Sequence, residues 1–247
     1  MNYIAYNEIS VYNKYGDYMK KIGIIAAMQE EKNAILDLMN DRETKMINNI
    51  EFSIGKIGQS DCVVTESGVG KVNSARVTQL LIDKFDINAI INVGSAGAIS
   101  NKLNIGDIII GDKLVQHDFD ITAFGHKKGY ISNVGEYVES DKEMIKKVKS
   151  IINRVDGDIN IQIGTIATGD VFCNTVKLKE IIANEFGAIA VEMEGAAIAQ
   201  VAYLNEIPFI VIRSISDSPN GKNEIDFETY LELASKRCAK IIKAYCE

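Results

Sequence analysis

The stretch that decides the fold reads Ala190-Val191-Glu192-Met193-Glu194-Gly195, in which two carboxylates bracket a methionine. It ends an apolar run and precedes an alanine-rich segment, the pattern of a strand that leads into a helix. Ligands of α/β proteins bind at such junctions. A second apolar run, 208–212, leads into Arg213-Ser214-Ile215-Ser216-Asp217. Together the two stretches predict a site for a polyhydroxylated, protonatable substrate.

Outside this stretch, apolar β-branched runs alternate with helix-like segments. The predicted strands are 22–27, 62–65, 89–93, 108–110, 161–167, 188–191 and 209–215, and the predicted helices are 29–39, 72–84, 142–152, 176–184, 195–204 and 227–246. Strands that are apolar throughout are buried on both faces. The pattern therefore predicts an α/β fold with a central, largely parallel or mixed sheet.

No linker interrupts residues 19–247, which we expect to form one domain. Residues 1–18 precede Met19-Lys20-Lys21-Ile22-Gly23, which reads as a natural chain start before a first strand. The alternatives for this N-terminal extension are a disordered arm, an upstream start codon or an added edge element.

The composition favours a small-molecule partner. The 247 residues include 47% hydrophobic side chains and carry a net charge of −7, which disfavours nucleic acid and anionic membranes as partners. No run is long and apolar enough to span a bilayer, so we expect a soluble cytoplasmic protein. Four scattered cysteines without C-x-x-C spacing and only two histidines predict no metal site. We expect no cofactor.

Two glycine-rich segments follow predicted strands. Gly68-Val69-Gly70-Lys71 lacks a Walker pattern because Thr65 and Val72 stand at its defining positions, and Asn73 breaks a dinucleotide pattern. A tight turn that opens a helix, and can still line a pocket, is the favoured interpretation. Gly94-Ser95-Ala96-Gly97 closes another run, either as a simple tight loop or as a place where a ligand approaches the backbone.

Several acids could serve structure or chemistry. Glu31 suits the first turn of a helix and Asp217 suits a cap. An aromatic residue such as Phe172 is more often a core residue than a stacking platform for a base. Alternation along an extended segment points Glu192 and Glu194 to one face and the residue between them to the other. Because no nucleophile or metal constellation accompanies them, the chemistry that remains is acid/base work by carboxylates on an uncharged substrate.

Seven motifs, in order, resemble the nucleoside phosphorylase/nucleosidase superfamily, and most closely its bacterial branch that acts on 5'-methylthioadenosine and S-adenosylhomocysteine. The resemblance runs from Lys21 to near the C-terminus and rests on Ile22-Gly23-Ile24-Ile25-Ala26-Ala27-Met28-Gln29-Glu30-Glu31, Ser67-Gly68-Val69-Gly70-Lys71-Val72, Asn92-Val93-Gly94-Ser95-Ala96-Gly97, Thr122-Ala123-Phe124-Gly125, Thr168-Gly169-Asp170-Val171-Phe172, Val191-Glu192-Met193-Glu194 and Arg213-Ser214-Ile215-Ser216-Asp217. It implies a nucleoside phosphorylase/hydrolase-like fold, a single-domain three-layer α/β/α arrangement around a central mixed sheet.

The resemblance also implies an activity. It is hydrolysis of the N-glycosidic bond of the two nucleosides, with 5'-deoxyadenosine as a further candidate, releasing adenine and a 5-thioribose for methionine salvage and methyl-cycle recycling. Asp217, positioned by Ser216, would donate a proton to N7 of adenine. Glu31 would be the general base for the attacking water, with Ser95 and Arg213 completing that water site.

The same resemblance implies the substrate contacts. Glu194 would accept hydrogen bonds from the ribose hydroxyls above Met193, while Phe172 stacks on adenine and the Cys173 backbone reads its edge. Val69 and Phe227 would line the 5'-thio pocket, and the neighbouring subunit of a homodimer would contribute Ile121 and Phe124. The full set of expected substrate-binding residues is Val69, Ser95, Ala96, Gly97, Ile121, Phe124, Phe172, Cys173, Glu192, Met193, Glu194, Arg213, Ser216 and Phe227.

Two other activities remain as alternatives. A phosphorylase would use phosphate as the nucleophile, but the Gln29-Glu30-Glu31 turn would repel an anion by several kcal/mol at intermediate dielectric. A non-catalytic nucleoside-binding protein would lack Glu31 or Asp217, and both are present. Two departures from the family pattern, Gln29 and His126, bear on the rim of the site and on the preference among 5' substituents.

Overall fold

The computed structural model describes residues 21–155, 160–217 and 227–247, so the predicted extension 1–18 lies outside it. Its strands are β1 (Lys21–Ala26), β2 (Asn40–Ile47), β3 (Ile50–Ile57), β4 (Ser60–Glu66), β5 (Ala89–Ala98), β6 (Ile108–Gln116), β7 (Val138–Glu139), β8 (Ile161–Thr168), β9 (Ala190–Glu192) and β10 (Phe209–Asp217). Its helices are α1 (Gln29–Leu36), α2 (Lys71–Phe85), the short 3₁₀ helix η1 (Thr122–Phe124), α3 (Lys142–Val155), α4 (Val176–Phe186), α5 (Gly195–Leu204) and α6 (Phe227–Cys246).

All ten strands belong to one mixed sheet, in the order β10-β6-β8-β9-β5-β1-β4-β3-β2 with β7 beside β6. Strand β10 also pairs with β5 in parallel, so part of the sheet closes upon itself. The parallel pairs β1–β4, β1–β5 and β5–β10 align their carboxyl ends. Functional side chains that follow these strands therefore gather at one edge.

Strand β1 shows why its sequence is apolar throughout. Ile22 and Ile24 pack into the core beneath α1, α3 and α6, whereas Ile25 packs into the core beneath α2 and α5. A strand covered on both faces needs apolar side chains at odd and even positions alike. Gly23 allows α2 to lie close, since a Cβ atom there would meet Leu81 Cδ2 at 2.5 Å.

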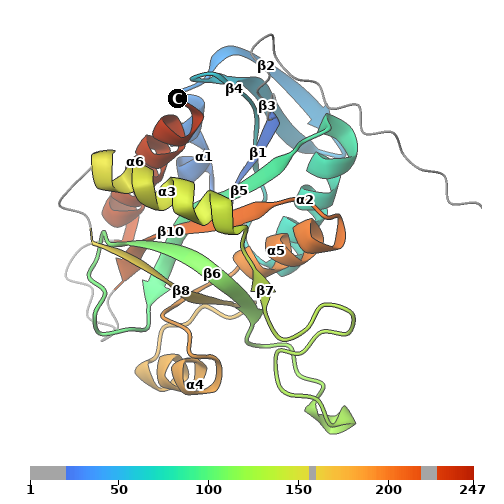
Figure 1. Ribbon diagram of the computed structural model, residues 1–247, viewed down its shortest axis with the longest axis vertical. Coiled ribbons are helices and arrows are strands. Elements are labelled where there is room, and N and C mark those ends of the chain that lie inside the picture. Colours follow the sequence, from blue (N-terminus) through green and yellow to red (C-terminus); the bar gives the residue numbers. More distant parts are fainter. Residues whose placement is uncertain (1–20, 156–159, 218–226) are drawn as a thin grey trace, which may run out of the picture.

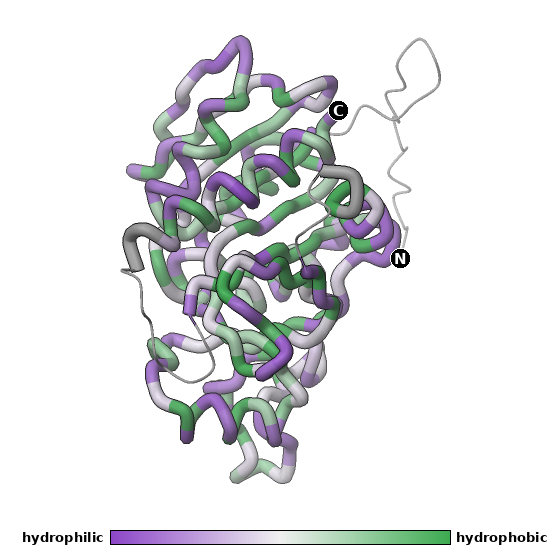
Figure 2. The backbone as a smooth tube through the Cα atoms, turned by 90° about the vertical axis from the view of Figure 1, so that its left-hand side faces the viewer, coloured by the Kyte–Doolittle hydropathy of each residue, from purple (hydrophilic) through white to green (hydrophobic). Residues whose placement is uncertain are grey.

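The helices form layers on both sides of the sheet, with α1, α3 and α6 on one face and α2 and α5 on the other (Figure 1). Along α3, Met144, Val148, Ile151 and Ile152 are buried, the spacing of an amphipathic helix. Figure 2 looks onto this side of the molecule, where hydrophobic and hydrophilic segments alternate along the helices. The predicted α/β fold with a central mixed sheet between helical layers is confirmed.

A third, smaller apolar cluster forms where α4 packs against β8 and β9, with Ile182 and Phe186 on the helix side. Helix α4 is seen at the lower end of the molecule in Figure 1, apart from the other helices.

The sequence analysis missed the hairpin β2–β3 and the short strand β7. Strand β2 is exposed along most of its length because it is an edge, so its sequence has no apolar pattern. A usable signal was the turn itself, because Ile47 pairs with Ile50 across Asn48 and Asn49, both at positive φ. Asparagine tolerates such angles and marks two-residue hairpin loops.

Strands β5, β6 and β10 also run further than predicted, and α1 ends earlier, at Leu36. Segment 94–97, which the sequence allowed as a loop, instead lies inside β5. None of the helices in the described part of the chain has the length and apolar character that a membrane crossing requires.

Candidate active site

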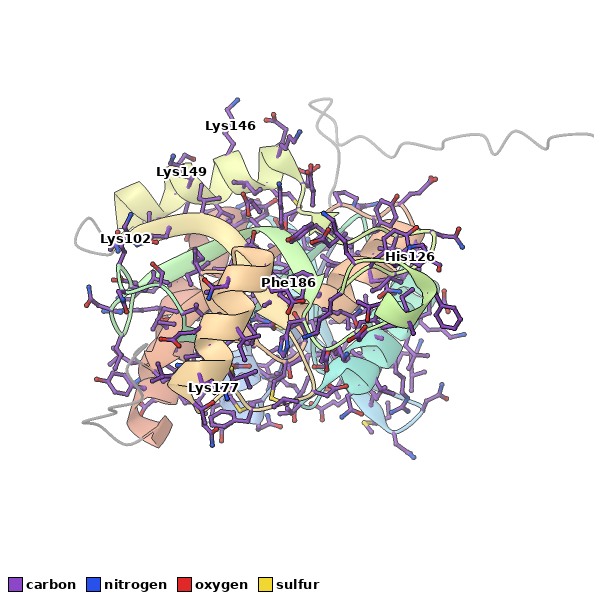
Figure 3. The ribbon with its side chains drawn as sticks, turned by 90° about the horizontal axis from the view of Figure 1, so that it is seen from below. Lys102, His126, Lys146, Lys149, Lys177 and Phe186 are labelled. Atoms are coloured by element: carbon purple, nitrogen blue, oxygen red, sulfur yellow. The ribbon has the colours of Figure 1, made fainter. Side chains whose placement is uncertain are left out.

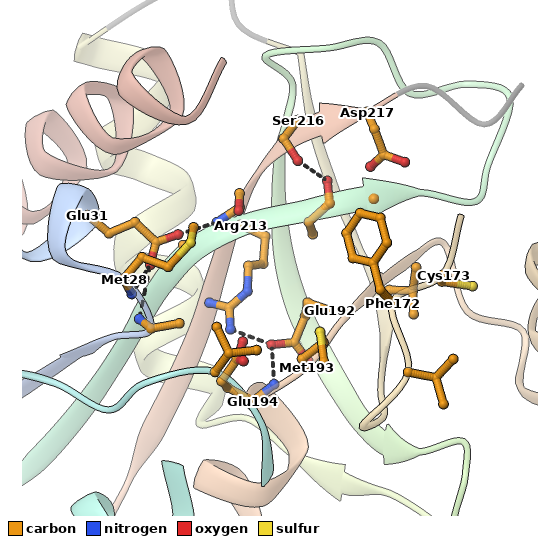
Figure 4. Close-up of a pocket in the computed structure, with 18 residues that line it drawn as sticks. Met28, Glu31, Phe172, Cys173, Glu192, Met193, Glu194, Arg213, Ser216 and Asp217 are labelled. Atoms are coloured by element: carbon orange, nitrogen blue, oxygen red, sulfur yellow. Dashed lines mark hydrogen bonds and ion pairs between the residues drawn. The ribbon is translucent and has the colours of Figure 1, made fainter. Parts of the chain in front are cut away.

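A pocket opens at the carboxyl ends of β1, β5, β9 and β10 (Figure 4). Its lining residues are Ala27, Met28, Glu31, Val69, Gly94, Ser95, Ala96, Gly97, Val171, Phe172, Cys173, Val191, Glu192, Met193, Glu194, Arg213, Ser216 and Asp217. The lining therefore combines apolar walls with four carboxylates and one guanidinium, a strongly polar set for a buried cavity.

Strand β5 forms the floor that connects the two ends of this pocket. At one end, a Cβ atom on Gly94 would lie 2.9 Å from Glu31 Oε1, and at the other, a Cβ atom on Gly97 would lie 2.7 Å from Asp217 Oδ1. Both glycines are thus required by close approach of a carboxylate to the backbone. Gly97 follows Gly94 by three positions along β5, so Glu31 and Asp217 lie at opposite ends of this floor.

Glu31 is held by backbone donors. It lies in the first turn of α1, and its Oε2 accepts hydrogen bonds from the N–H groups of Ala27 (3.0 Å) and Met28 (3.1 Å) while Oε1 accepts from Ser95 N–H (3.0 Å). Burial raises the pKa of this carboxyl, against the lowering effects of Arg213 and of the three backbone donors. A fixed carboxylate with a raised pKa suits a general base.

Asp217 lies at the far end of the pocket, where β10 ends. Its partner across the sheet is Gly97, after an irregularity in the β5–β10 register that follows Ile215. The adjacent Ser216 hydroxyl donates to the Ala96 carbonyl at 3.4 Å, which fixes this end of β10 against β5. The Asp217 Oδ2 atom lies 2.7 Å from the ammonium of Lys179 on α4.

A buried ion pair beneath the pocket joins strand β10 to strand β9. The Arg213 guanidinium donates to Glu192 Oε2 and, at 2.6 Å, to Asn92 Oδ1. Glu192 also accepts from the Thr168 hydroxyl and from the N–H groups of Glu194 and Gly195, at the N-terminus of α5. Both Glu192 oxygens therefore have protein donors, and the helix terminus favours its negative charge.

Burial lowers the pKa of the Arg213 guanidinium, but the nearby carboxylates of Glu192 and Glu194 have the larger, opposite effect. The pKa of Arg213 is therefore raised above its usual value. One cation thus serves three buried carboxylates, Glu31, Glu192 and Glu194. An excess of negative charge in a dry site resists full ionisation.

Glu194 is the carboxyl group whose pKa is raised by burial and by this excess of negative charge. Its Oε1 accepts a hydrogen bond from Gly70 N–H at 2.8 Å, and burial followed by the charge of Glu192 raises its pKa to about 7. Its carboxylate lies beside the pocket with acceptor capacity left. A partly protonated acid at neutral pH is poised to gain from any ligand that donates hydrogen bonds to it.

The turn that supplies this N–H donor has the expected form. Gly68 and Gly70 have φ of +75° and +100°, and α2 begins at Lys71, which confirms a tight turn opening a helix. Asp170 Oδ1 accepts from Lys71 N–H, and the Lys71 ammonium pairs with Asp118 at 2.6 Å. These contacts tie the turn to the ends of β6 and β8.

Most of the predicted residues meet in this pocket. The thirteen that line it are Val69, Ser95, Ala96, Gly97, Phe172, Cys173, Glu192, Met193, Glu194, Arg213 and Ser216, with Glu31 and Asp217. The expectation that Met193 faces away from Glu192 and Glu194 was wrong, because β9 ends at Glu192 and the chain turns into α5, so that all three line the pocket.

Two predicted residues do not line it, and the side chain of a third is not described. Ile121 and Phe124 belong to the segment after β6, and Phe124 is 82% exposed. Phe227 begins α6, but its side chain lies outside the described residues. The sequence analysis overlooked Asn92 and Thr168, which hold Arg213 and Glu192. Asn92 had a signal, a polar residue inside an otherwise apolar buried strand.

The fold and this pocket have a known counterpart. A family model described as the phosphorylase superfamily matches residues 21–247. The chain therefore belongs to the phosphorylase superfamily.

Within it, the chain is similar to curated enzymes of one kind. It is 42% identical over 224 residues to the 5'-methylthioadenosine/S-adenosylhomocysteine nucleosidase of Staphylococcus haemolyticus, covering 90% of this chain and 97% of that protein.

Solved structures agree. The S-adenosylhomocysteine nucleosidase of Streptococcus pyogenes, in complex with 5-methylthiotubericidin, superposes with a TM-score of 0.87 at 39% identity, covering 92% of this chain and 95% of that one. The futalosine hydrolase of Helicobacter pylori has a TM-score of 0.86 at 34% identity, covering 92% and 97%.

Proposed function

We propose that this chain hydrolyses the N-glycosidic bond of 5'-methylthioadenosine and S-adenosylhomocysteine, releasing adenine and a 5-thioribose. Relatives at about 40% identity over nine-tenths of the chain are named for this activity. The reaction breaks the C1'–N9 bond, joins a water oxygen to C1', passes a water proton to a base and delivers another proton to the purine. It therefore needs two acid/base groups on opposite sides of the sugar–base bond.

The observation that carries the assignment is the pair of carboxylates that approach β5 at Gly94 and Gly97, in the carboxyl-terminal half of this strand. Glu31, held by three backbone N–H groups, has lone pairs left to orient and deprotonate a water beside Arg213. Asp217, at the opposite end of the pocket floor, would protonate N7 so that adenine leaves neutral. We assign Glu31 as general base and Asp217 as general acid.

Between these two groups, Glu194 accepts hydrogen bonds from the ribose 2'- and 3'-hydroxyls. Its charge also stabilises the positive charge that develops on the sugar as the bond breaks. Phe172 is 68% exposed and offers a ring face for adenine, while the backbone of Cys173 meets the edge of the base. Met193 and Val69 complete the apolar wall around the sugar and its 5' substituent.

Two features favour water over phosphate as the nucleophile. The backbone donors near the predicted nucleophile position, at Ala27, Met28 and Ser95, are already occupied by the Glu31 carboxylate. The Arg213 guanidinium is shared between Asn92 and Glu192. A phosphate dianion here would meet a negative charge instead of free donors.

We further propose a homodimer in which Ile121 and Phe124 complete the 5' end of the neighbouring site. The segment that carries them projects from the body of the molecule, beyond the end of β6 (Figure 1). Phe124 and Val72 are 82% and 79% exposed, and a second copy that covers them would bury this apolar surface. We also propose a cytoplasmic location, which suits four free cysteines.

The test is adenine release from 5'-methylthioadenosine in phosphate-free buffer. The native chain is compared with Asp217→Asn and Glu31→Gln, and with Glu180→Gln on the exposed surface of α4 as the matched control. We expect release without phosphate, a loss of at least about 10²-fold in the first two variants and none in the control. Activity that appears only when phosphate is added would make the chain a phosphorylase instead.

A further inference from the structure

A lysine on the buried face of α4 contacts the acid end of the active site. Lys179 is 4% exposed and shares the buried stripe of its helix with Ile182 and Phe186, at spacings i, i+3 and i+7. That stripe normally carries apolar residues. Lysines are almost never fully buried unless they are paired, so the position of this charge needs a reason.

The contact between Lys179 and Asp217 gives a reason for this buried charge. The Lys179 Nζ atom lies 2.7 Å from Asp217 Oδ2, while Asp217 Oδ1 lies over the backbone of Gly97. Lys179 is not among the residues that line the pocket, whereas Asp217 is. The ammonium therefore contacts the Asp217 carboxylate from outside the pocket lining.

We propose that Lys179 is a positioning residue for the acid step, one that holds the Asp217 carboxyl group in place and stabilises the carboxylate left behind when its proton passes to the purine. The inference rests on the proposed function. The O–H bond of Asp217 breaks and an N7–H bond forms as the C1'–N9 bond breaks. The negative charge then remaining on Asp217 lies beside a cation, which lowers the free energy of that state.

Only the protonated form of a carboxyl group can donate to N7, and the cation acts on the carboxylate that this donation leaves. Asp217 is 20% exposed, so solvent can return a proton after each turnover.

Other groups near Asp217 do not duplicate this role. The Cys173 thiol lies in the segment before α4, and burial raises its pKa, so it is neutral at physiological pH. Strand β5 contributes the backbone of Gly97. Among the described residues that face Asp217 from these elements, Lys179 is the charged one.

The experiment is a pH profile of kcat/KM for 5'-methylthioadenosine in phosphate-free buffer, from pH 5 to 10. The variants are Lys179→Met, a near-isosteric apolar replacement, and Lys179→Arg, which keeps the charge. Lys177→Met, at the exposed end of the same helix, is the control (Figure 3). Melting temperatures verify that each variant is folded.

We expect Lys179→Met to lower kcat/KM for 5'-methylthioadenosine by about tenfold, because the carboxylate left after proton donation loses its cation. Lys179→Arg retains the native kcat/KM, and Lys177→Met matches the native chain throughout. An equal loss with a substrate whose leaving group needs no protonation would show that Lys179 only supports the fold, and no loss would show that the pair has no part in the reaction. Either result overturns the proposal.

A second substrate isolates the acid step. A 4-nitrophenyl 5-methylthioriboside has a leaving group that departs without protonation, so Lys179→Met should hydrolyse it as fast as the native chain. In an Asp217→Asn background, Lys179→Met should cause no further loss with 5'-methylthioadenosine. If Asp217→Asn alone leaves adenine release intact, the acid assignment fails independently of Lys179.

Discussion

Replacing Glu194 with glutamine should stabilise the empty protein while it destroys activity. The pKa of Glu194 is raised from 4.5 to about 7, first by burial and then by the charge of Glu192. A raised pKa means that the folded state binds a proton more tightly than the unfolded chain does. Ionising Glu194 at high pH therefore costs folding free energy, and a neutral side chain avoids that cost.

Proton linkage gives the sign and the size of this cost in folding free energy. The cost is absent below the unfolded pKa of 4.5, grows as the pH rises and is complete above about 7. At 1.36 kcal/mol per pKa unit the full cost is on the order of 3 kcal/mol. For a domain of this size it corresponds to roughly 6–12 °C in melting temperature. Glutamine keeps an oxygen that can accept from Gly70 N–H, so that hydrogen bond need not be lost.

The assay is a set of thermal unfolding curves at pH 5, 7 and 8.5 without ligand. We expect Glu194→Gln to melt close to the native chain at pH 5 and well above it at pH 8.5, while Glu180→Gln on the surface changes neither. Activity of Glu194→Gln should fall by about 10²-fold or more, because charged hydrogen bonds to the sugar are lost. A variant that melts at or below the native temperature at pH 8.5 would refute the reasoning.

Three further outcomes are expected. Gly97→Ala should lower kcat at least about tenfold with the fold intact, because its Cβ would lie 2.7 Å from Asp217 Oδ1; circular dichroism and kinetics test this. Gly23→Ala should instead lower the free energy of unfolding by about 1–3 kcal/mol with kcat unchanged, because its Cβ would meet Leu81 at 2.5 Å; urea unfolding measures it. Phe124→Ser should weaken self-association in sedimentation and raise KM, whereas a native chain that sediments as a fully active monomer contradicts the dimer.

Strand ends were readable from the sequence because burial on both faces leaves long apolar runs. Phe209–Ile215 is one such run. Arg213 interrupts it inside the sheet, and Asp217 follows it at the carboxyl end of β10. Their roles came from the order of seven motifs resembling one superfamily. The geometry that makes them work was not readable: nothing local to Gly94 shows that a carboxylate sixty residues away packs against it.

Tertiary pairing also explains what was missed. Lys179 reads as an ordinary helix lysine, and only the approach of β10 to α4 turns it into a partner of Asp217. Strand β2 lacked any apolar period because its side chains on both faces are exposed, and only its pairing with β3 makes it a strand. In both cases the missing information is a contact outside the segment, which periodicity within one segment does not record.

The charge distribution of the empty site explains why binding and chemistry are coupled in it. Among the described residues, Arg213 is the cation that faces Glu31, Glu192 and Glu194, and Glu192 takes its direct ion pair. Burial raises the pKa values of Glu31 and Glu194, and the charge of Glu192 raises that of Glu194 further, so the site resists the ionised state that the reaction needs. A nucleoside relieves this in two steps: its hydroxyls donate to Glu194 on binding, and its sugar becomes positive as the glycosidic bond breaks. The positive sugar attracts the carboxylates of the site more strongly than neutral hydroxyls do. The excess negative charge of the site therefore binds the transition state more tightly than the substrate, which is the requirement for catalysis.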